Sequence, residues 1–126
     1  MKRLTVAATL MVSCILAYSV GVFAQTRAAK VDPVKVDSKH YKVEFENVKV
    51  RVLRVSYGAG ETSVMHYNPD AVIVSLTGDK TRMSTPDGKS REDSTKAGGV
   101  IWAPAGSRLP QNISEQRDEV IIVELK

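Results

Sequence analysis

The side chains that could carry out chemistry are few in this 126-residue chain. It contains two histidines, His40 and His66, and a single cysteine, Cys14. Ser63 lies three residues before His66, but a serine nucleophile also needs that histidine to be positioned by a third group, and nothing in the sequence identifies such a geometry. The Gly-x-Ser-x-Gly, P-loop, dinucleotide-binding and Cys-x-x-Cys motifs are absent from the sequence. The sequence therefore excludes the enzyme classes that depend on these signatures.

Aromatic and basic residues provide the other candidates. Tyr57 and Trp102 fall in strand-like patterns, where aromatic side chains pack in a core, and both could also line a pocket. Arg108 would need an anionic partner if it pointed inward, such as Asp70 or a bound carboxylate or phosphate. On a solvated loop it would need none. We expect His40, which precedes the first strand pattern, to face solvent.

The first 24 residues have the layout of a secretory signal peptide. A basic start at Lys2 and Arg3 precedes an uncharged, mostly apolar stretch over residues 4–22, and the small Ala24 suits a signal-peptidase site. We expect cleavage after Ala24 and export, to the periplasm or out of the cell. Two alternatives remain open. In the first, the apolar stretch over residues 4–22 is not cleaved and stays as a membrane anchor, since it nearly reaches the roughly 20 residues that span a bilayer. In the second, Cys14 carries a lipid.

Cleavage also changes the charge and the cysteine content. Without Lys2 and Arg3, 16 of the 18 basic residues remain against 14 acidic ones, a net charge of +2, and these charges are interspersed rather than clustered. Such a balance gives no support for a nucleic-acid partner or a membrane partner of the mature protein. Because Cys14 is removed too, no disulfide is expected, and the stability must come from the core.

Short strands dominate the rest of the chain, which we divide into a loose N-terminal arm over residues 25–38 and a β-barrel domain over residues 39–126. We expect the arm to cover a sheet edge. Apolar and charged residues alternate from Tyr41 to Glu46, as in a half-buried strand. The apolar phase continues through residues 48–52 and then shifts by one position, which predicts a β-bulge or a bend at Arg54.

The second half of the domain contains a central strand and a hairpin. The nearly continuous apolar run from Ala71 to Leu76 predicts a central strand buried on both faces. Pro86-Asp87-Gly88 predicts a hairpin turn, and a tight turn at residues 77–80 predicts a neighbouring antiparallel pair. Further strands are expected at residues 80–84, 90–95, 100–103 and 119–125. About seven short strands at regular spacing favour an all-β sandwich or barrel.

Two stretches of the sequence resemble the two motifs of the cupin family. The stretch from Gly60 to Asp70, which contains His66 and Asn68, resembles the first motif: a glycine, five residues, His-x-His and an acidic residue a few positions on. The stretch from Gly98 to Asn112 resembles the second: a glycine, five residues, Pro-x-Gly, a histidine and a late asparagine. The resemblance covers the chain from about residue 48 to the C-terminus. It implies a small cupin-type jelly-roll β-barrel.

The metal site that this resemblance implies is incomplete. The family holds an iron, manganese, nickel or zinc ion with three imidazoles and a carboxylate. The corresponding residues here are His66 at the first histidine, Asn68 at the second, Val72 or a neighbour at the acidic residue, and Arg108 at the third histidine. An amide oxygen is a weak ligand, and a guanidinium has no lone pair to offer. Asp70 could still join His66 and Asn68, so a transition metal on these three residues remains an alternative to a protein without a cofactor.

Two functions from different classes follow from this resemblance. The first is an exported, non-catalytic cupin-like module that binds a small polar or anionic molecule at the mouth of the barrel. Its expected binding residues are His66, Asn68, Arg108, Tyr57 and Trp102. The second function is a metal-dependent cupin enzyme of the dioxygenase or isomerase type that uses the reduced ligand set. A homodimer formed by pairing of barrel edges is left open in both cases.

Overall fold

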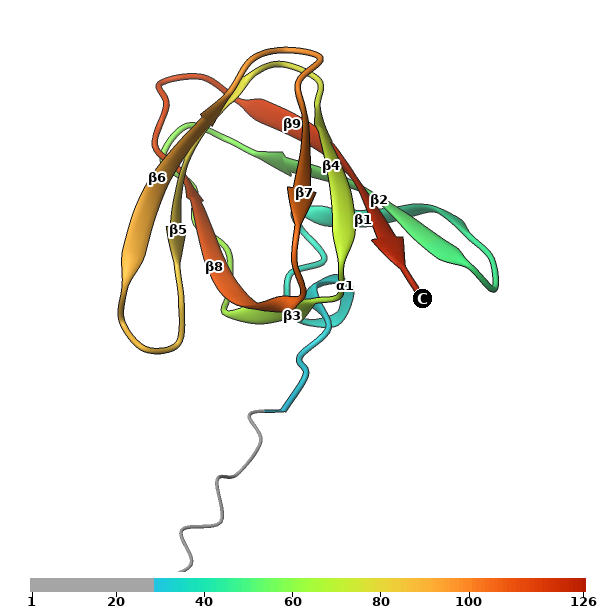
Figure 1. Cartoon of the computed structure of the whole chain (residues 1–126). Coiled ribbons are helices and arrows are strands. Elements are labelled where there is room, and N and C mark those ends of the chain that lie inside the picture. The colour runs from blue at the N-terminus through green and yellow to red at the C-terminus, as the bar shows by residue number, and fades with distance from the viewer. Residues whose placement is uncertain (1–28) are drawn as a thin grey trace, which may run out of the picture.

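The structure is a computed structural model that describes residues 29–126 (Figure 1). The predicted signal peptide, its cleavage site and Cys14 therefore lie outside the described residues. Within the described part of the chain, no helix combines the length and the apolar character that a membrane crossing requires.

Nine strands and one short helix make up residues 29–126. Their bounds in chain order are α1 Pro33–Val36, β1 Tyr41–Glu46, β2 Val50–Tyr57, β3 His66–Asn68, β4 Ala71–Ser75, β5 Asp79–Ser84, β6 Ser90–Thr95, β7 Val100–Ala103, β8 Gly106–Asn112 and β9 Asp118–Leu125. Four glycines of the described residues have positive φ, and two of them are Gly78 between β4 and β5 and Gly88 between β5 and β6. Glycine adopts this conformation without a steric penalty, so both turns can be tight.

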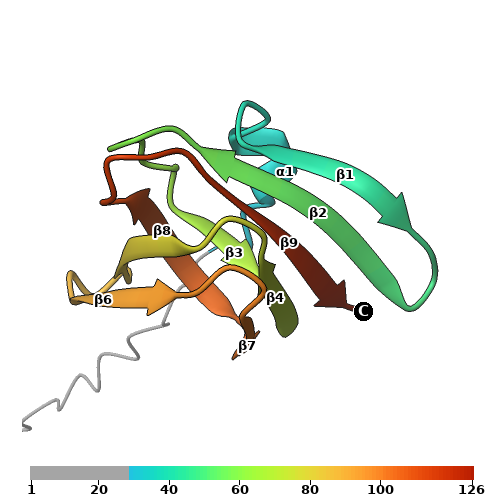
Figure 2. The same ribbon diagram turned by 90° about the horizontal axis from the view of Figure 1, so that it is seen from above.

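The strands form two antiparallel sheets that face each other across the core (Figure 2). The five-stranded sheet has the order β1-β2-β9-β4-β7, and the four-stranded sheet has the order β3-β8-β5-β6. Inward side chains of the five-stranded sheet, such as Leu53, Val55 and Ile122, are buried in the core, and the residues between them point to the opposite face. This arrangement is a jelly-roll β-barrel and confirms the predicted all-β fold.

The predicted bulge at Arg54 is wrong. β2 pairs with β9 along its whole length without a register shift, and the irregularity lies instead in β1, between Val43 and Phe45. The shift in apolar phase has a different cause, because β2 carries apolar side chains on both of its faces. Leu53 points into the core and is fully buried, whereas its neighbour Val52 lies on the outer face of the sheet and is partly exposed.

The hairpin prediction is confirmed, since β5 and β6 pair around Pro86-Asp87-Gly88. The predictions for β4 hold only in part. β4 lies between β9 and β7, but Val72 and Val74 are partly exposed, so the strand is not buried on both faces. Nor does β4 pair with β5, because the turn between them carries the chain from one sheet to the other. The sequence pattern also missed β3, which has three residues, and β8, which contains Pro110.

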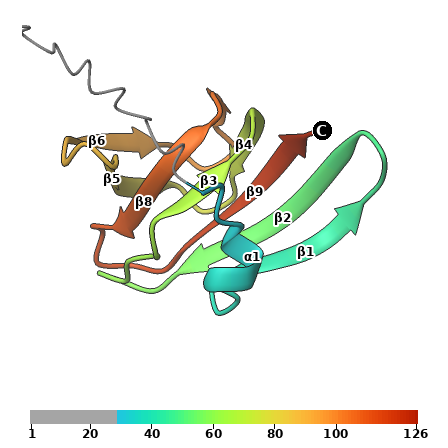
Figure 3. The ribbon, with the colours of Figure 1, turned by 90° about the horizontal axis from the view of Figure 1, so that it is seen from below.

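The described part of the predicted loose arm has a defined structure. Asp32 caps α1 by accepting a hydrogen bond from the N–H of Val34 (3.0 Å). The N–H of Tyr67 donates to the carbonyl of Val31 (2.8 Å), so the arm lies along the free edge of β3 (Figure 3). The arm thus covers a sheet edge, as expected, but it is held by specific contacts rather than being loose.

Candidate ligand site in the barrel

A cavity of about 280 Å³ lies between the two sheets. The inward-facing residues at alternating strand positions form its wall. Apolar side chains such as Val55, Ile73 and Ile122 make up much of this wall. The charged residues that also line it are Asp79, Arg91, Asp93, Arg108 and Asp118. A cavity that is mostly apolar with a few polar groups is typical of a small-molecule site.

Arg108, on β8, is a half-buried cation without an acidic partner. Its guanidinium donates a hydrogen bond to the carbonyl of Pro104, and among residues 29–126 no carboxylate forms an ion pair with it. Burial, together with the nearby charge of Arg91, lowers the pKa of Arg108. Asp70, which we considered as its partner, accepts a hydrogen bond from the N–H of Ala105 instead (2.7 Å). The cavity therefore contains a partly desolvated positive charge.

His66 lies directly opposite Arg108 in the ladder between β3 and β8, but it is buried behind the cavity wall. Its Nδ1–H donates to the carbonyl of Val64 (2.7 Å), and its Nε2 accepts a hydrogen bond from the hydroxyl of Tyr41 (3.0 Å). Burial lowers the pKa of His66. A neutral imidazole with its proton on Nδ1 satisfies both contacts. His66 is not part of the cavity wall itself, but its hydrogen-bond partner Tyr41 lines the cavity.

Two tyrosines extend this chain of hydrogen bonds. The hydroxyl of Tyr57 donates to the hydroxyl of Tyr41 (2.7 Å), which in turn donates to His66. The ring of Tyr41 packs edge-on against both neighbours, with its centroid 6.2 Å from Tyr57 and 4.9 Å from His66. Burial raises the pKa of both tyrosines, so their hydroxyls stay protonated. Tyr57 belongs both to the buried core and to the cavity wall.

The three residues considered as metal ligands each make hydrogen bonds to other groups of the chain. The Nε2 of His66 is engaged by Tyr41, the amide N–H of Asn68 donates to Glu124 (3.1 Å), and Asp70 caps a backbone N–H in an exposed loop. Among residues 29–126, no group of three or more histidine, cysteine, aspartate or glutamate side chains is arranged to hold a metal ion. The residues present do not fit a cupin metal centre.

His40 is buried, with 7% of its surface exposed, so the prediction that it faces solvent is wrong. Its Nδ1 lies 2.7 Å from Asp37 Oδ1, and its Nε2 lies 2.8 Å from Glu61 Oε2. A carboxylate oxygen therefore faces each ring nitrogen of His40. The hydroxyl of Ser63 also donates to Asp37 (2.6 Å). Asp37 precedes His40 by only three residues, and this short spacing was the available sequence signal for their contact. Glu61 follows His40 by 21 residues.

Asp118 and Asp79 form an acidic region of the cavity that sequence reasoning missed. Asp118 is 4% exposed and accepts a hydrogen bond from the N–H of Tyr57 (3.2 Å). Burial raises the pKa of Asp118 to about 6, although the hydrogen bond from Tyr57 opposes this shift, and the charge of Asp79 adds to it. Burial also raises the pKa of Asp79. No sequence signal marks these residues, because only the fold brings the start of β5 close to the start of β9.

Trp102 lies at the rim of the cavity, but its side chain points away from it. It stands opposite Val72 in the ladder between β4 and β7 and is 55% exposed. Its neighbours Ile101 and Ala103 line the cavity, so the alternation of the strand directs the indole to the outer face of the sheet. The prediction that Trp102 packs in the core is therefore wrong.

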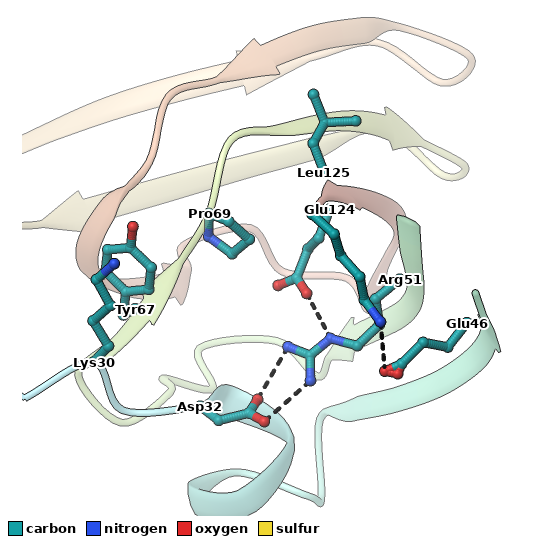
Figure 4. Close-up of a pocket in the computed structure, with 9 residues that line it drawn as sticks. Lys30, Asp32, Glu46, Arg51, Tyr67, Pro69, Glu124 and Leu125 are labelled. Atoms are coloured by element: carbon teal, nitrogen blue, oxygen red, sulfur yellow. Dashed lines mark hydrogen bonds and ion pairs between the residues drawn. The ribbon is translucent and has the colours of Figure 1, made fainter. Parts of the chain in front are cut away.

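A second, shallower crevice of about 250 Å³ lies where the N-terminal arm meets the end of β9 (Figure 4). Arg51 spans it, with ion pairs to Asp32 (3.0 Å) and to Glu124 (2.6 Å). Glu124 is 2% exposed and also accepts the amide N–H of Asn68. These ion pairs join the arm to the barrel.

The comparisons with known proteins address the fold. No model of a known protein family matches the sequence, and no curated protein matches it. Solved structures do match. A cupin domain from Bordetella pertussis Tohama I is 24% identical, with a TM-score of 0.63 over 68% of this chain and 91% of that one.

Two further structures agree with this likeness. A cupin-family protein with a double-stranded β-helix fold from Methanocaldococcus jannaschii is 18% identical, with a TM-score of 0.53 over 71% of this chain and 83% of that one. A cupin superfamily protein from Desulfitobacterium hafniense DCB-2 is 13% identical, with a TM-score of 0.52 over 68% and 74%. Identities this low establish the fold and nothing finer. The chain has the jelly-roll fold of the cupins, as the resemblance of its two motifs implies.

Proposed function

We propose that this protein binds a small anionic molecule in the barrel cavity, without catalysing a reaction on it, and that Arg108 supplies the binding charge. The supporting observation is that the half-buried Arg108 has no acidic partner among the described residues. A carboxylate or phosphate group would provide the missing countercharge, and the planar guanidinium can bind either through two parallel hydrogen bonds.

The rest of the cavity suits a small ligand. Its volume of about 280 Å³ is close to the lower end of the range for ligand pockets. Tyr57 and Asn68 line it, and both are fixed by hydrogen bonds to neighbouring side chains. Such fixed polar groups would orient a ligand whose charge is bound by Arg108. In this proposal His66 has an indirect role, since it holds the hydroxyl of Tyr41 in place.

The compartment of this activity is also part of the proposal. The basic start and apolar stretch within residues 1–24 support binding in the periplasm or outside the cell. A binding protein there would meet free carboxylates and phosphates.

The test compares Arg108→Gln with a matched surface variant, Arg82→Gln. Arg82 lies on β5, is exposed, and pairs with Glu92 (3.0 Å). The probes are acetate, succinate and inorganic phosphate, and the readouts are thermal shift and calorimetric titration. We expect at least one probe to raise the Tm of the wild type and of Arg82→Gln, but not that of Arg108→Gln.

Two results would overturn the proposal. One is a wild-type protein whose Tm none of these anions changes. The other is an Arg108→Gln variant that binds as tightly as the wild type. Conversion of a bound probe that stops in the presence of a chelator would instead favour the metal-dependent enzyme.

A further inference from the structure

The cavity has charges of opposite sign at its two ends. Asp118 lies at the start of β9 and Asp79 at the start of β5, whereas Arg108 lies near the start of β8. β5 and β8 are neighbours in the four-stranded sheet (Figure 1). In their antiparallel ladder the last residue of β5, Ser84, pairs with Leu109, the neighbour of Arg108. Asp79 and Arg108 therefore lie at opposite ends of this ladder.

The five-stranded sheet gives the same order. The guanidinium of Arg108 donates to the carbonyl of Pro104, directly after β7. Ala103, the last residue of β7, lies level with Glu124 of β9, because both pair with the same residue of β4. Glu124 is six residues beyond Asp118. At a rise of about 3.4 Å per residue, the two ends are roughly 20 Å apart along the backbone, and the side chains reach inward from both.

The wall between the two ends is apolar. Val120 and Ile122 follow Asp118 at alternate positions of β9, so all three side chains face inward, and all three line the cavity. Val55 and Ile73 line it from the neighbouring strands, paired with Val120 and Ile122 in the ladders. A ligand that reaches from one end of the cavity to the other would therefore need an apolar middle.

Asp118 is a buried carboxylate with one oxygen open to the cavity. It is 4% exposed, and its Oδ1 accepts the N–H of Tyr57 (3.2 Å), but none of residues 29–126 donates to its Oδ2. In this part of the chain no side-chain nitrogen or oxygen is both sealed from solvent and without a partner, so Oδ2 faces the cavity that Asp118 lines. A ligand that donates a hydrogen bond to this oxygen would offset the cost of burying it.

No cation among the described residues pairs with Asp118 or Asp79. Neither forms an ion pair, whereas Asp93, which also lines the cavity, pairs with Arg91 (2.8 Å). The charge of His40 acts against the effect of burial on the pKa of Asp118, but both ring nitrogens of His40 face other carboxylates. Asp118 and Asp79 therefore form a negative end of the cavity without a paired countercharge.

We propose that the ligand is an elongated zwitterion of the ω-amino acid class, with its ammonium group at Asp118 and Asp79, its carboxylate at Arg108 and a methylene chain between them. This inference rests on the proposed function, because it adds a cationic group to the anionic group that Arg108 binds. An ammonium group has three N–H donors and a positive charge, so it can donate to Oδ2 of Asp118 and balance the negative end. The methylene chain would pack on the apolar wall and exclude water from it.

A metal ion fits the negative end less well than an ammonium group does. Within residues 29–126, histidine, cysteine, aspartate and glutamate side chains form no group of three or more that could hold a metal ion. A hard cation such as Ca²⁺ takes about six to eight oxygen ligands, far more than Asp118 and Asp79 provide. An ammonium group needs only the few acceptors that these two carboxylates offer.

The test compares ω-aminooctanoate with octanoate and octylamine, each of which carries only one of the two charged groups. Calorimetric titration at neutral pH measures the three affinities, and ω-amino acids of four to twelve carbons, with their matched carboxylates and amines, remove the dependence on one chain length. We expect the best ω-amino acid to bind the wild type at least about tenfold more tightly than either single-charge probe of the same length, since each end contributes a charge-assisted hydrogen bond.

Three variants locate the ammonium group. Asp118→Asn removes the charge but can still accept the N–H of Tyr57, so it should weaken the zwitterion about tenfold and leave the affinity for octanoate no lower. Asp79→Asn should act in the same direction, and it replaces Asp118→Asn if that variant folds poorly. The matched control is Glu92→Gln on β6, an exposed side chain that pairs with Arg82 (3.0 Å), and it should bind like the wild type.

Two results would contradict the zwitterion. In one, octanoate or octylamine binds the wild type as tightly as the ω-amino acid at every chain length. In the other, folded Asp118→Asn and Asp79→Asn both keep the full affinity for the zwitterion. Failure of the proposed function would look different, because octanoate would then bind Arg108→Gln as tightly as the wild type, or would bind neither.

Discussion

Arg108 and His66 are direct neighbours across the ladder between β8 and β3, and burial lowers the pKa of both. The charge of Arg108 is one of the causes that lower the pKa of His66. The pair therefore carries a single positive charge, on Arg108, while the neutral imidazole acts as a hydrogen-bond acceptor for Tyr41. One charge rather than two limits the electrostatic cost of the cavity when no ligand is bound.

Tyr41→Phe should destabilise the fold. It removes the hydroxyl that bonds both His66 and Tyr57, and leaves two buried polar groups without a partner. We expect a loss of about 1–3 kcal/mol in the free energy of unfolding, measured in urea. Tyr67→Phe is the control, because that ring is partly exposed and lies under the ammonium of Lys30 (4.8 Å). Equal losses in the two variants would contradict the role of Tyr41.

Asp118→Asn should stabilise the protein at neutral pH. Burial raises the pKa of Asp118 from 3.8 to about 6, so folding favours its protonated form, and the stability falls as the pH rises from about 4 to about 6. Asparagine is neutral throughout and can still accept the N–H of Tyr57. The variant should therefore be more stable at pH 7 by about 2 kcal/mol and no more stable than the wild type near pH 4. Urea unfolding at the two pH values checks this, and a less stable variant at pH 7 would refute it.

Glu61→Gln should change the acid sensitivity of the fold. A hydrogen bond from Lys39, helped by the N–H of Gly58 and by His40, lowers the pKa of Glu61 from 4.5 to about 2. A lowered pKa means that the carboxylate contributes stability above pH 4.5, and that this contribution is lost as the pH falls toward 2. The variant should lose less stability over that interval than the wild type. Glu115→Gln, in an exposed turn, should behave like the wild type in the same titration.

Arg51→Met and Arg54→Met should lose very different amounts of stability, although both residues lie on β2. Arg51 compensates Glu124, which is 2% exposed, and its loss would leave that carboxylate buried and unpaired. We expect Arg51→Met to cost about 3–5 kcal/mol. Arg54 pairs with one exposed and one partly exposed carboxylate on the outer face, where water screens the charges, so Arg54→Met should cost much less. Chemical denaturation of the two variants side by side measures both losses, and similar losses would contradict the difference expected between a buried and a screened ion pair.

The sequence predicted the fold class because the strand patterns are strong and the two cupin-like motifs keep their spacing. It failed where both faces of a strand are apolar. Val52 and Leu53 point in opposite directions, yet together they resemble a shift in phase, and the same ambiguity made β4 look buried on both faces. Periodicity alone does not separate an exposed apolar face from a change of register.

The candidate site was predictable only in part. The resemblance matched His66 and Arg108 to two positions of one site, and the structure pairs them directly in the ladder between β3 and β8. The position of Tyr41 was not predictable, because β1 lies outside both motifs and reaches His66 through the packing of the two sheets. The three-residue spacing from Asp37 to His40 was a signal for that pair, but the contact of His40 with Glu61, 21 residues further along the chain, depends on the fold.

The hydrogen bond between Tyr41 and His66 also sets the order in which a metal centre could be engineered into this barrel. Arg108→His alone would place a second imidazole across from His66, but the Nε2 of His66 would still be turned to the hydroxyl of Tyr41. Tyr41→Phe alone would free that nitrogen beside a repelling guanidinium. A designer would therefore have to change both positions together, and supply an acidic ligand from a strand position other than 72, whose side chain points out of the barrel.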